Sequence, residues 1–355
     1  MKDLRVNLYK GCFSLVKKSG VGQAILHQRD MLKNLGVEIT DGLGCDADIA
    51  QFNTIFPDSF LAAVMAHIRG MTVVYYAHST AEDFRNSFKL SNAFAPFFKW
   101  WITRCYNRGD VIITPTDYSK KLLRSYGIRK PIYNLSNGVD TEFFAPSDVR
   151  RAKFRARHGL RPGDKAVMSV GHYIERKGLP EFVELARRMP DFRFFWFGYT
   201  DLKLVPDNIR AAIANAPSNL TFPGYVGREE LREAYNGCDL FTFMSKEETE
   251  GIVVLEALAC GVPAVVRDIP VYRSWLEDGV NVYKAVNFND FAAKVPSILD
   301  GSLPDLTDMG LEVAESRSIR EIGRRLMSIY KSECDLAGNK TAHIAAAPEI
   351  PNVIE

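Results

Sequence analysis

The stretch Ser245-Lys-Glu-Glu-Thr-Glu-Gly-Ile-Val-Val-Leu-Glu-Ala-Leu-Ala-Cys-Gly-Val-Pro263 has the pattern of a strand that leads through an acidic loop into a helix. The apolar run before it predicts a strand that ends near Met244, and a helix is expected from about Gly251. Gly261 fits a helix C-cap and Pro263 stands beyond it, so the helix should end there. Such a loop lies at the carboxyl edge of a parallel sheet, where the ligand sites of these sheets are found.

The same alternation extends over the whole chain. In the second half we expect strands at 166–170, 192–197, 220–222, 240–244 and 264–266, and helices at 180–189, 228–236, 251–260 and 288–299. In the first half we expect strands at 4–8, 49–52, 71–77 and 111–114, and helices near 22–35, 59–69, 96–107 and 118–126. Strand-helix alternation builds right-handed βαβ units and parallel sheets. We therefore predict an α/β protein of two Rossmann-like, doubly wound domains that face each other across a cleft.

The predicted domain boundaries follow the same pattern. We expect a first domain over 1–145, a hinge region over 146–163 with its prolines and charged run, and a second domain over 164–311. A helix over 312–333 is long enough to return toward the first domain, and 334–355 is expected to be a flexible tail.

Composition limits the class of protein. The chain has 355 residues, 46% hydrophobic and 25% charged, which argues against a disordered, collagen-like or disulfide-scaffold protein. A net charge of +2 is too small to indicate nucleic-acid binding. Six cysteines without a C-x-x-C pair suggest reduced thiols in the cytoplasm rather than a zinc site. No signal-peptide pattern and no apolar run near ~20 residues is found, so we do not expect the chain to cross a membrane.

Two carboxylates flank the glycine turn of the opening stretch. Glu248 precedes the turn and Glu256 lies inside the helix, while the amides of Gly251, Ile252 and Val253 can bind an anion or a hydroxyl. A carboxylate can accept hydrogen bonds from both hydroxyls of a vicinal diol, as in a ribose or a hexose. The alternative is an acidic first turn that stabilises the helix dipole, with Glu256 on a solvated face.

Four motifs in order resemble one family. Glu248-x7-Glu256 with Ala257-Leu-Ala-Cys-Gly-Val-Pro263 is similar to the E-x7-E signature of retaining GT-B glycosyltransferases of family 4. Phe222–Phe241 resembles the segment before that signature, Asn137-Gly-Val-Asp the interdomain motif, and Val170–Gly178 the first strand and phosphate loop of the second domain.

The resemblance implies a role for each matching position. The second domain would bind a nucleotide-sugar, with Arg176 and Lys177 at the diphosphate, Glu248 and the amides of Gly251, Ile252 and Val253 at the sugar, and Glu256 at the ribose. The first domain would contribute the glycine loop of Gly20 and Gly22, and His78 near the reacting carbon. His78 and Glu248 are the predicted catalytic residues. His172 stands where the family often has Arg, which puts one phosphate cation in doubt, and a basic turn before a helix is the alternative for Arg176 and Lys177.

The resemblance also implies a mechanism. The sugar would be transferred with retention of configuration, without a protein nucleophile, cofactor or bound metal. The basic residues would neutralise the leaving diphosphate.

One basic, aromatic segment has no place in this donor site. Residues 85–130 hold ten Lys and Arg against Asp110 and Asp117. Within it, Phe94, Phe97, Phe98, Trp101, Ile102 and Cys105 recur at helical spacing and are expected to be core. Lys99, Trp100, Arg104 and Arg108 form another face, which we predict contacts an anionic membrane surface. The alternative is an ordinary solvated basic face.

The strings His78-Ser-Thr-Ala-Glu-Asp-Phe-Arg-Asn-Ser-Phe and Glu247-Glu-Thr-Glu-Gly resemble the glycolipid-synthesising branch of Gram-positive bacteria. That resemblance implies transfer of glucose or galactose, from UDP-glucose or UDP-galactose, to diacylglycerol or monoglucosyl-diacylglycerol. The acceptor and membrane would meet the first domain, on the cytoplasmic face of the cell membrane. The alternatives are a soluble family-4 glycosyltransferase with a polysaccharide or small acceptor, and a nucleotide- or sugar-binding protein or Rossmann oxidoreductase.

Overall fold

The computed structural model describes residues 4–17, 19–42, 46–87 and 91–345, with side chains described up to residue 335. The described strands form two parallel sheets of six strands each. The N-terminal sheet has the order β2-β1-β3-β4-β5-β6, and its strands are β1 (Arg5–Tyr9), β2 (Glu38–Thr40), β3 (Ile49–Phe52), β4 (Thr72–Tyr76), β5 (Val111–Thr114) and β6 (Ile132–Asn134). The helices of this unit are α1 (Phe13–Val16), α2 (Gly20–Asn34), α3 (Pro57–Ile68), α4 (Ala81–Phe84), α5 (Ser91–Tyr106) and α6 (Asp117–Ser125).

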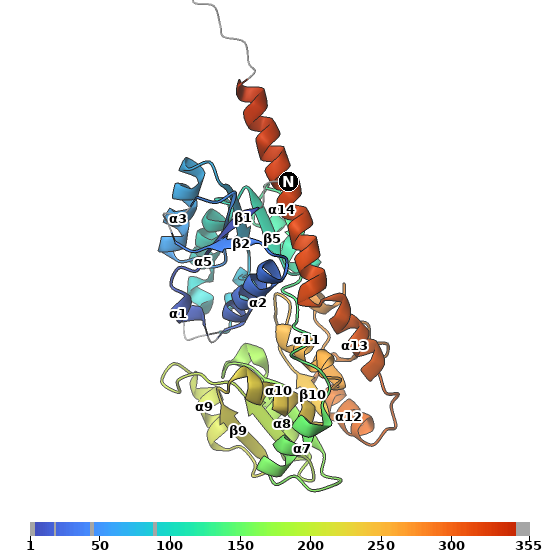
Figure 1. The fold of residues 1–355 in the computed structure, drawn as a ribbon. Coiled ribbons are helices and arrows are strands. Elements are labelled where there is room, and N and C mark those ends of the chain that lie inside the picture. The colour runs from blue at the N-terminus through green and yellow to red at the C-terminus, as the bar shows by residue number, and fades with distance from the viewer. Residues whose placement is uncertain (1–3, 18, 43–45, 88–90, 346–355) are drawn as a thin grey trace, which may run out of the picture.

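The C-terminal sheet has the order β12-β11-β10-β7-β8-β9, in which β7 and β10 are neighbours at the point where the strand order reverses. Its strands are β7 (Ala166–Val170), β8 (Arg193–Phe197), β9 (Leu220–Gly224), β10 (Leu240–Phe243), β11 (Ala264–Arg267) and β12 (Tyr283–Ala285). Around them lie α7 (Asp148–Arg157), α8 (Leu179–Arg188), α9 (Asp207–Ala214), α10 (Arg228–Gly237), α11 (Ile252–Ala259), α12 (Phe288–Leu299) and α13 (Thr307–Ser316), with the 3₁₀ turns η1 (Glu175–Lys177) and η2 (Pro270–Tyr272). The prediction of two Rossmann-like halves is confirmed (Figure 1).

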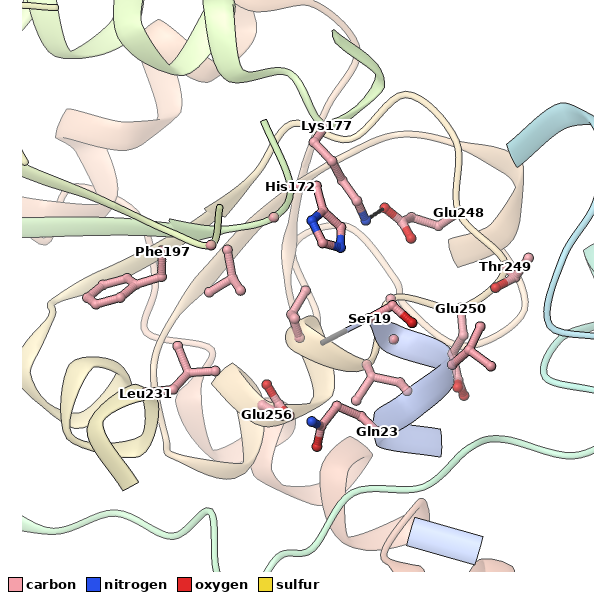
Figure 2. Close-up of a pocket in the computed structure, with 18 of the residues that line it drawn as sticks. Ser19, Gln23, His172, Lys177, Phe197, Leu231, Glu248, Thr249, Glu250 and Glu256 are labelled. Atoms are coloured by element: carbon pink, nitrogen blue, oxygen red, sulfur yellow. Dashed lines mark hydrogen bonds and ion pairs between the residues drawn. The ribbon is translucent and has the colours of Figure 1, made fainter. Parts of the chain in front are cut away.

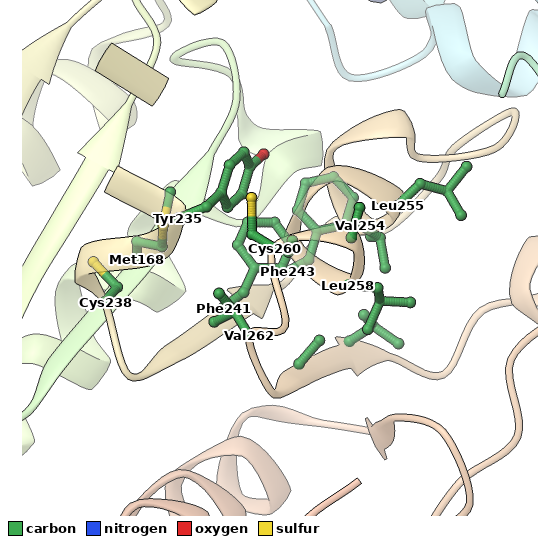
Figure 3. Close-up of a cluster of buried hydrophobic side chains, with 14 of the residues drawn as sticks. Met168, Tyr235, Cys238, Phe241, Phe243, Val254, Leu255, Leu258, Cys260 and Val262 are labelled. Atoms are coloured by element: carbon green, nitrogen blue, oxygen red, sulfur yellow. The ribbon is translucent and has the colours of Figure 1, made fainter. Parts of the chain in front are cut away.

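The core of the C-terminal unit explains where the site lies. Strands β7, β8 and β10 are apolar on both faces, as expected for a parallel sheet covered by helices. On one face, Phe241 and Phe243 of β10 pack with Tyr235 of α10 and with Val254 and Leu258 of α11 (Figure 3). This packing fixes α11 against the sheet, and with it the acidic loop that precedes the helix.

The predicted hinge is partly a helix. Residues 148–157 form α7, whose Phe154 is fully buried against Phe195 and the backbone of Gly237. The charged run is held by ion pairs, because Arg151 binds Asp239 and Arg157 binds a carboxylate of α10. The run therefore packs with the C-terminal unit, a contact that the prolines and charges alone do not reveal.

The C-terminal helix also differs from its expected bounds. In place of one helix over 312–333, α13 ends at Ser316 and α14 (Ile319–Ala345) follows. The break occurs because Val139 pairs with Ser318 in a parallel bridge and exchanges backbone hydrogen bonds with Arg317 and Ile319. Helix α14 then runs beside the N-terminal unit, where Ile322, Leu326 and Tyr330 join its core (Figure 1). Of the predicted tail, 346–355 lies outside the described residues, and 334–345 is helical.

Helix α5 buries only part of the stripe predicted for the core, because Ile102 and Cys105 are buried and Phe98 and Trp101 pack partly buried against the core. Phe94 and Phe97, expected in the core, are 57% and 63% exposed. The buried positions are Ser91, Ala95, Ile102, Cys105 and Tyr106. The first half of the helix packs on α4, where Phe98 stacks on Phe84 with ring centroids 4.1 Å apart, and Phe94 and Phe97 are rotated off the buried side.

Candidate active site

The carboxyl edges of the two sheets share a cavity of about 310 Å³. Ser19 and Gly20 at the start of α2 and His78 after β4 line it from the N-terminal unit. The C-terminal unit contributes the loops after β7, β8, β9 and β10 and the first half of α11 (Figure 2). Among the residues of the predicted donor site, the lining includes Gly20, His78, Arg176, Lys177, Glu248, Gly251, Ile252, Val253 and Glu256.

Glu248 and Lys177 form a buried ion pair in the cavity wall. The Lys177 ammonium contacts Glu248 Oε1 (Figure 2). Ser245 Oγ donates a 2.6 Å hydrogen bond to the same oxygen. Burial alone would raise the pKa of the Glu248 carboxyl, but Lys177 and Arg176 outweigh it and the pKa is lowered. Glu248 is therefore ionised at neutral pH.

The turn before α11 requires glycine. Gly251 has a φ of 94°, and a Cβ built there would lie 2.9 Å from the Tyr272 hydroxyl oxygen. The left-handed conformation costs other residues free energy, and the close ring leaves them no room. The turn directs the first amides of α11 at the cavity, where the helix N-terminus favours negative charge.

Glu256 lies one turn further along α11, deep in the cavity wall. It is 4% exposed, and Tyr235 donates its hydroxyl hydrogen to Glu256 Oε2 over 3.0 Å. Burial raises the pKa of the Glu256 carboxyl to about 7, although the tyrosine opposes the shift. The alternative of a Glu256 on a solvated face is therefore excluded, because Tyr235 of α10 covers it.

His78 is held in a neutral form beside the cavity. Its Nε2 lies 2.8 Å from Asn53 Oδ1, and its ring stacks on Tyr76 with centroids 5.6 Å apart. Burial lowers the pKa of His78 to about 4. The imidazole can therefore exchange hydrogen bonds with a bound molecule without bringing a charge.

The two predicted glycines of the N-terminal loop have different surroundings. Gly20 borders the cavity, and a Cβ there would meet open space. Gly22 is not among the described lining residues, and a Cβ there would lie 2.3 Å from the carbonyl oxygen of Val16. Gly22 thus lets α2 pass close to α1 and has no direct place in the cavity, contrary to the expectation.

His172 stands at the phosphate-site position where the resembled family often has Arg. It lines the cavity, and its Nδ1 lies 3.1 Å from the carbonyl oxygen of Tyr199. Burial lowers the pKa of His172, and the nearby Lys177 and Arg176 add to the effect. The imidazole is therefore neutral where the resembled family often has a cation, and Arg176 and Lys177 carry the positive charge of this wall.

The sequence did not reveal several lining residues. Tyr199 and Tyr225 follow β8 and β9 and border the cavity half-exposed, at 50% and 46%. Their position after predicted strands at the same sheet edge was the available signal. Glu250, fully buried, accepts hydrogen bonds from the Asn137 amide (3.0 Å) and side chain (2.7 Å), which ties the acidic loop to the segment between the units.

The predicted membrane-contact residues lie apart from the cavity lining. Trp100 is 48% exposed, with the Arg104 guanidinium 4.7 Å from the centroid of its ring. Lys99 lies over the ring of Tyr126, 4.4 Å from its centroid, so it faces α6 rather than the Trp100 row. Arg108 lies over Phe60 of α3, 4.9 Å from the ring centroid.

Comparison with known proteins identifies the class of fold. The Anabaena protein HepE, solved in complex with UDP and glucose, superposes with a TM-score of 0.77 at 15% identity, over 93% of this chain and all of that one. The profile "Glycosyltransferase Family 4" matches residues 22–143, and "Glycosyl transferases group 1" matches residues 150–313. The fold is that of the GT-B glycosyltransferases.

Relatives in sequence narrow the assignment. The "Processive diacylglycerol alpha-glucosyltransferase" of Acholeplasma laidlawii is 37% identical over 92% of this chain and 98% of that protein. The "Alpha-galactosylglucosyldiacylglycerol synthase" of Streptococcus pneumoniae is 27% identical over 78% of this chain and 75% of its own length. The chain belongs to the family-4 glycosyltransferases of GT-B fold, in the branch of these glycolipid synthases, and the prediction of a hexosyltransferase is confirmed.

Proposed function

We propose that the protein transfers a hexose, with retention of configuration, from UDP-glucose or UDP-galactose to diacylglycerol or monoglucosyl-diacylglycerol. The main support is the likeness, over nearly the full length of both chains, to a protein named as a diacylglycerol glucosyltransferase. The gathering of the predicted donor residues other than Gly22 in one cavity between the units adds to this support. The nucleotide-sugar donor and the hydroxyl of the lipid acceptor would then meet at the cavity, with the sugar between them.

The donor half of the proposal follows from the charges of the cavity. Lys177 and Arg176 offer positive charge to the diphosphate, whose negative charge grows as the sugar leaves. Ionised Glu248 accepts hydrogen bonds from sugar hydroxyls, and Glu256 accepts them from the ribose diol. His78 lies across the cavity and contacts the sugar near its reacting carbon.

Retention in this arrangement needs no protein nucleophile. The diphosphate oxygen that leaves the sugar can accept the proton of the acceptor hydroxyl on the same face, while an oxocarbenium-like centre forms. Among the described residues, no group of three or more His, Cys, Asp or Glu side chains is placed to hold a metal ion. That the reaction needs no metal or cofactor stays a prediction, and activity after exhaustive EDTA treatment tests it.

The acceptor half rests on an exposed face of the N-terminal unit. Phe97 and Trp100 of α5 stack with ring centroids 5.5 Å apart, and both are exposed. Helix α3 lies beside α5, since Phe60 packs on Trp101 with centroids 5.6 Å apart, and α3 exposes Leu61 and Ile68. No described helix is long and apolar enough to cross a bilayer.

An anionic membrane surface suits this face. Aromatic and aliphatic side chains enter the headgroup region, and nearby Arg104 and Arg108 add attraction of about 1 kcal/mol each at an anionic leaflet. Lys99, packed on Tyr126, would contribute at the edge of the contact. We therefore place the protein, as part of the proposal, on the cytoplasmic face of the cell membrane.

One screen tests the proposal. Radiolabelled UDP-glucose and UDP-galactose are offered with vesicles that contain diacylglycerol or monoglucosyl-diacylglycerol, and labelled glycolipid is measured. Glu248→Ala should abolish transfer, while Glu184→Ala, which removes an exposed carboxylate of α8, should not. Transfer only to polysaccharide or small acceptors would favour the soluble alternative, and no transfer or hydrolysis of any nucleotide-sugar would refute the proposal.

A further inference from the structure

Arg176 lies between two carboxylates from opposite sides of the cavity. Its Nη1 is 2.8 Å from Asp83 Oδ1 of α4, in the N-terminal unit, and 3.6 Å from Glu248 Oε1 in the acidic loop. Its Nε donates a hydrogen bond of 3.3 Å to Ser87 Oγ. With 9% of Arg176 exposed, this is a buried contact between the two units.

The backbone around Asp83 holds its carboxylate in place. Thr80 caps α4 by accepting a hydrogen bond from the Asp83 amide over 3.1 Å. Ser87 Oγ donates to the Asp83 carbonyl over 2.9 Å, and the Ala81 amide donates to the Tyr126 hydroxyl over 2.9 Å. Asp83 also lines the cavity, on the same connection after β4 that carries His78.

The charge of Asp83 depends on Arg176. Burial raises the pKa of the Asp83 carboxyl and Glu248 adds to the increase, whereas Arg176 opposes both. A diphosphate bound at Arg176 competes with Asp83 for the same guanidinium, because both anions take its N–H donors. When the diphosphate takes donors of Arg176, Lys177 still favours the ionised form of Asp83, and the carboxylate is left in the cavity with lone pairs to offer.

We propose that Asp83 binds the acceptor hydroxyl, and that it becomes available to do so when the donor diphosphate engages Arg176. The inference rests on the proposed function, and it adds a residue and an order of binding to it. A carboxylate released in this way accepts a hydrogen bond from an alcohol and orients its oxygen toward the sugar. As the sugar leaves and negative charge grows on the diphosphate oxygen, the single hydroxyl hydrogen turns from Asp83 to that oxygen, which takes the proton. Donor binding would therefore precede productive acceptor binding.

The substitution Asp83→Asn distinguishes a role in binding the acceptor hydroxyl from a purely structural ion pair between the two units. The substitution removes the anion that competes for Arg176, so the dissociation constant for UDP, measured by isothermal titration calorimetry, should fall about tenfold. The KM for diacylglycerol in vesicles should rise about tenfold, because the amide is a weaker acceptor of the hydroxyl hydrogen. Asp207→Asn, at an exposed ion pair on α9, is the matched control and should keep both values.

A change of UDP affinity in the opposite direction would overturn the inference. If Asp83 only holds the units together, Asp83→Asn weakens UDP binding, and an unchanged KM for the acceptor contradicts the role at the hydroxyl. Failure of the wild-type protein to bind UDP would count against the proposed function instead.

Ser87→Ala keeps the test decisive if Asp83→Asn does not fold. It removes one hydrogen bond from Arg176 and leaves the carboxylate, so UDP should bind about two- to threefold more tightly with an unchanged acceptor KM. Weaker UDP binding by Ser87→Ala would equally contradict the competition.

Discussion

Replacing Glu256 with glutamine should remove a pH dependence from donor binding. The Glu256 carboxyl is buried in the cavity wall, and burial raises its pKa to about 7. In our proposal the ribose diol donates hydrogen bonds to this group, and the ionised form accepts them best. Donor affinity should therefore fall as the pH drops through 7.

The size of the effect follows from the pKa. With a pKa of about 7, roughly 90% of Glu256 is ionised at pH 8 and roughly 10% at pH 6. The dissociation constant for UDP-glucose should thus be about tenfold higher at pH 6 than at pH 8. In Glu256→Gln it should be nearly the same at both, and higher than the wild-type value at pH 8.

Isothermal titration calorimetry with UDP-glucose suits this test, because its esterified diphosphate has no group that titrates in the range. Glu247→Gln is the control, since burial also raises the pKa of Glu247 to about 7, but this residue is not among the described cavity lining. In Glu247→Gln the dissociation constant for UDP-glucose should depend on pH as it does in the wild type. A flat wild-type profile, or a slope that survives in Glu256→Gln, would refute the assignment of Glu256 to the donor.

The same residue gives a stability test with a defined sign. The folded pKa of about 7 lies above the ordinary value of 4.5, so the folded state binds more protons between these values. Stability should therefore fall as pH rises through this window, by about 3 kcal/mol in all from this group. Glu256→Gln removes the free-energy cost of ionising this buried carboxyl. The thermal midpoint of the variant minus that of the wild type should therefore increase from pH 5 to pH 8. If this difference in thermal midpoint is the same at pH 5 and pH 8, Glu256 does not titrate in that range.

Three further variants test the fold and the exposed face. Gly251→Ala, at a φ of 94° and with its Cβ close to the Tyr272 hydroxyl, should lower the free energy of unfolding by about 1–3 kcal/mol and impair transfer; full wild-type stability in denaturant titration would contradict the strain. Phe154→Ala should cost about 3–5 kcal/mol, because α7 loses its buried anchor, and a loss below 1 kcal/mol would mean that α7 is not packed on the sheet. The double variant with Phe97→Ala and Trp100→Ala should lose sedimentation with anionic vesicles at an unchanged thermal midpoint; retained binding would exclude this face as the membrane contact.

The residues of the candidate site could be predicted where they closely follow the end of a strand. Lys177, Glu248 and the Gly251 turn each follow a strand that the apolar pattern reveals, and parallel strands bring these ends to one edge. Asp83 was different, since nothing in its neighbourhood shows that Arg176, far along the chain, contacts it across the cavity. Likewise, the burial of Glu256 depends on α10, which covers the face of α11 on which it lies.

The sequence by itself determined the alternation of strands and helices, the glycine turn and the order of the family motifs, because these depend on neighbouring residues and on the period of each element. It did not determine the short edge strands β2, β6 and β12, which are three residues each and have too little pattern to detect. Only the tertiary structure decided which stripe of α5 is buried, that α7 belongs with the C-terminal sheet, and that Arg176 meets Asp83. These features depend on contacts between surfaces that lie far apart in the chain, so no pattern of neighbouring residues reveals them.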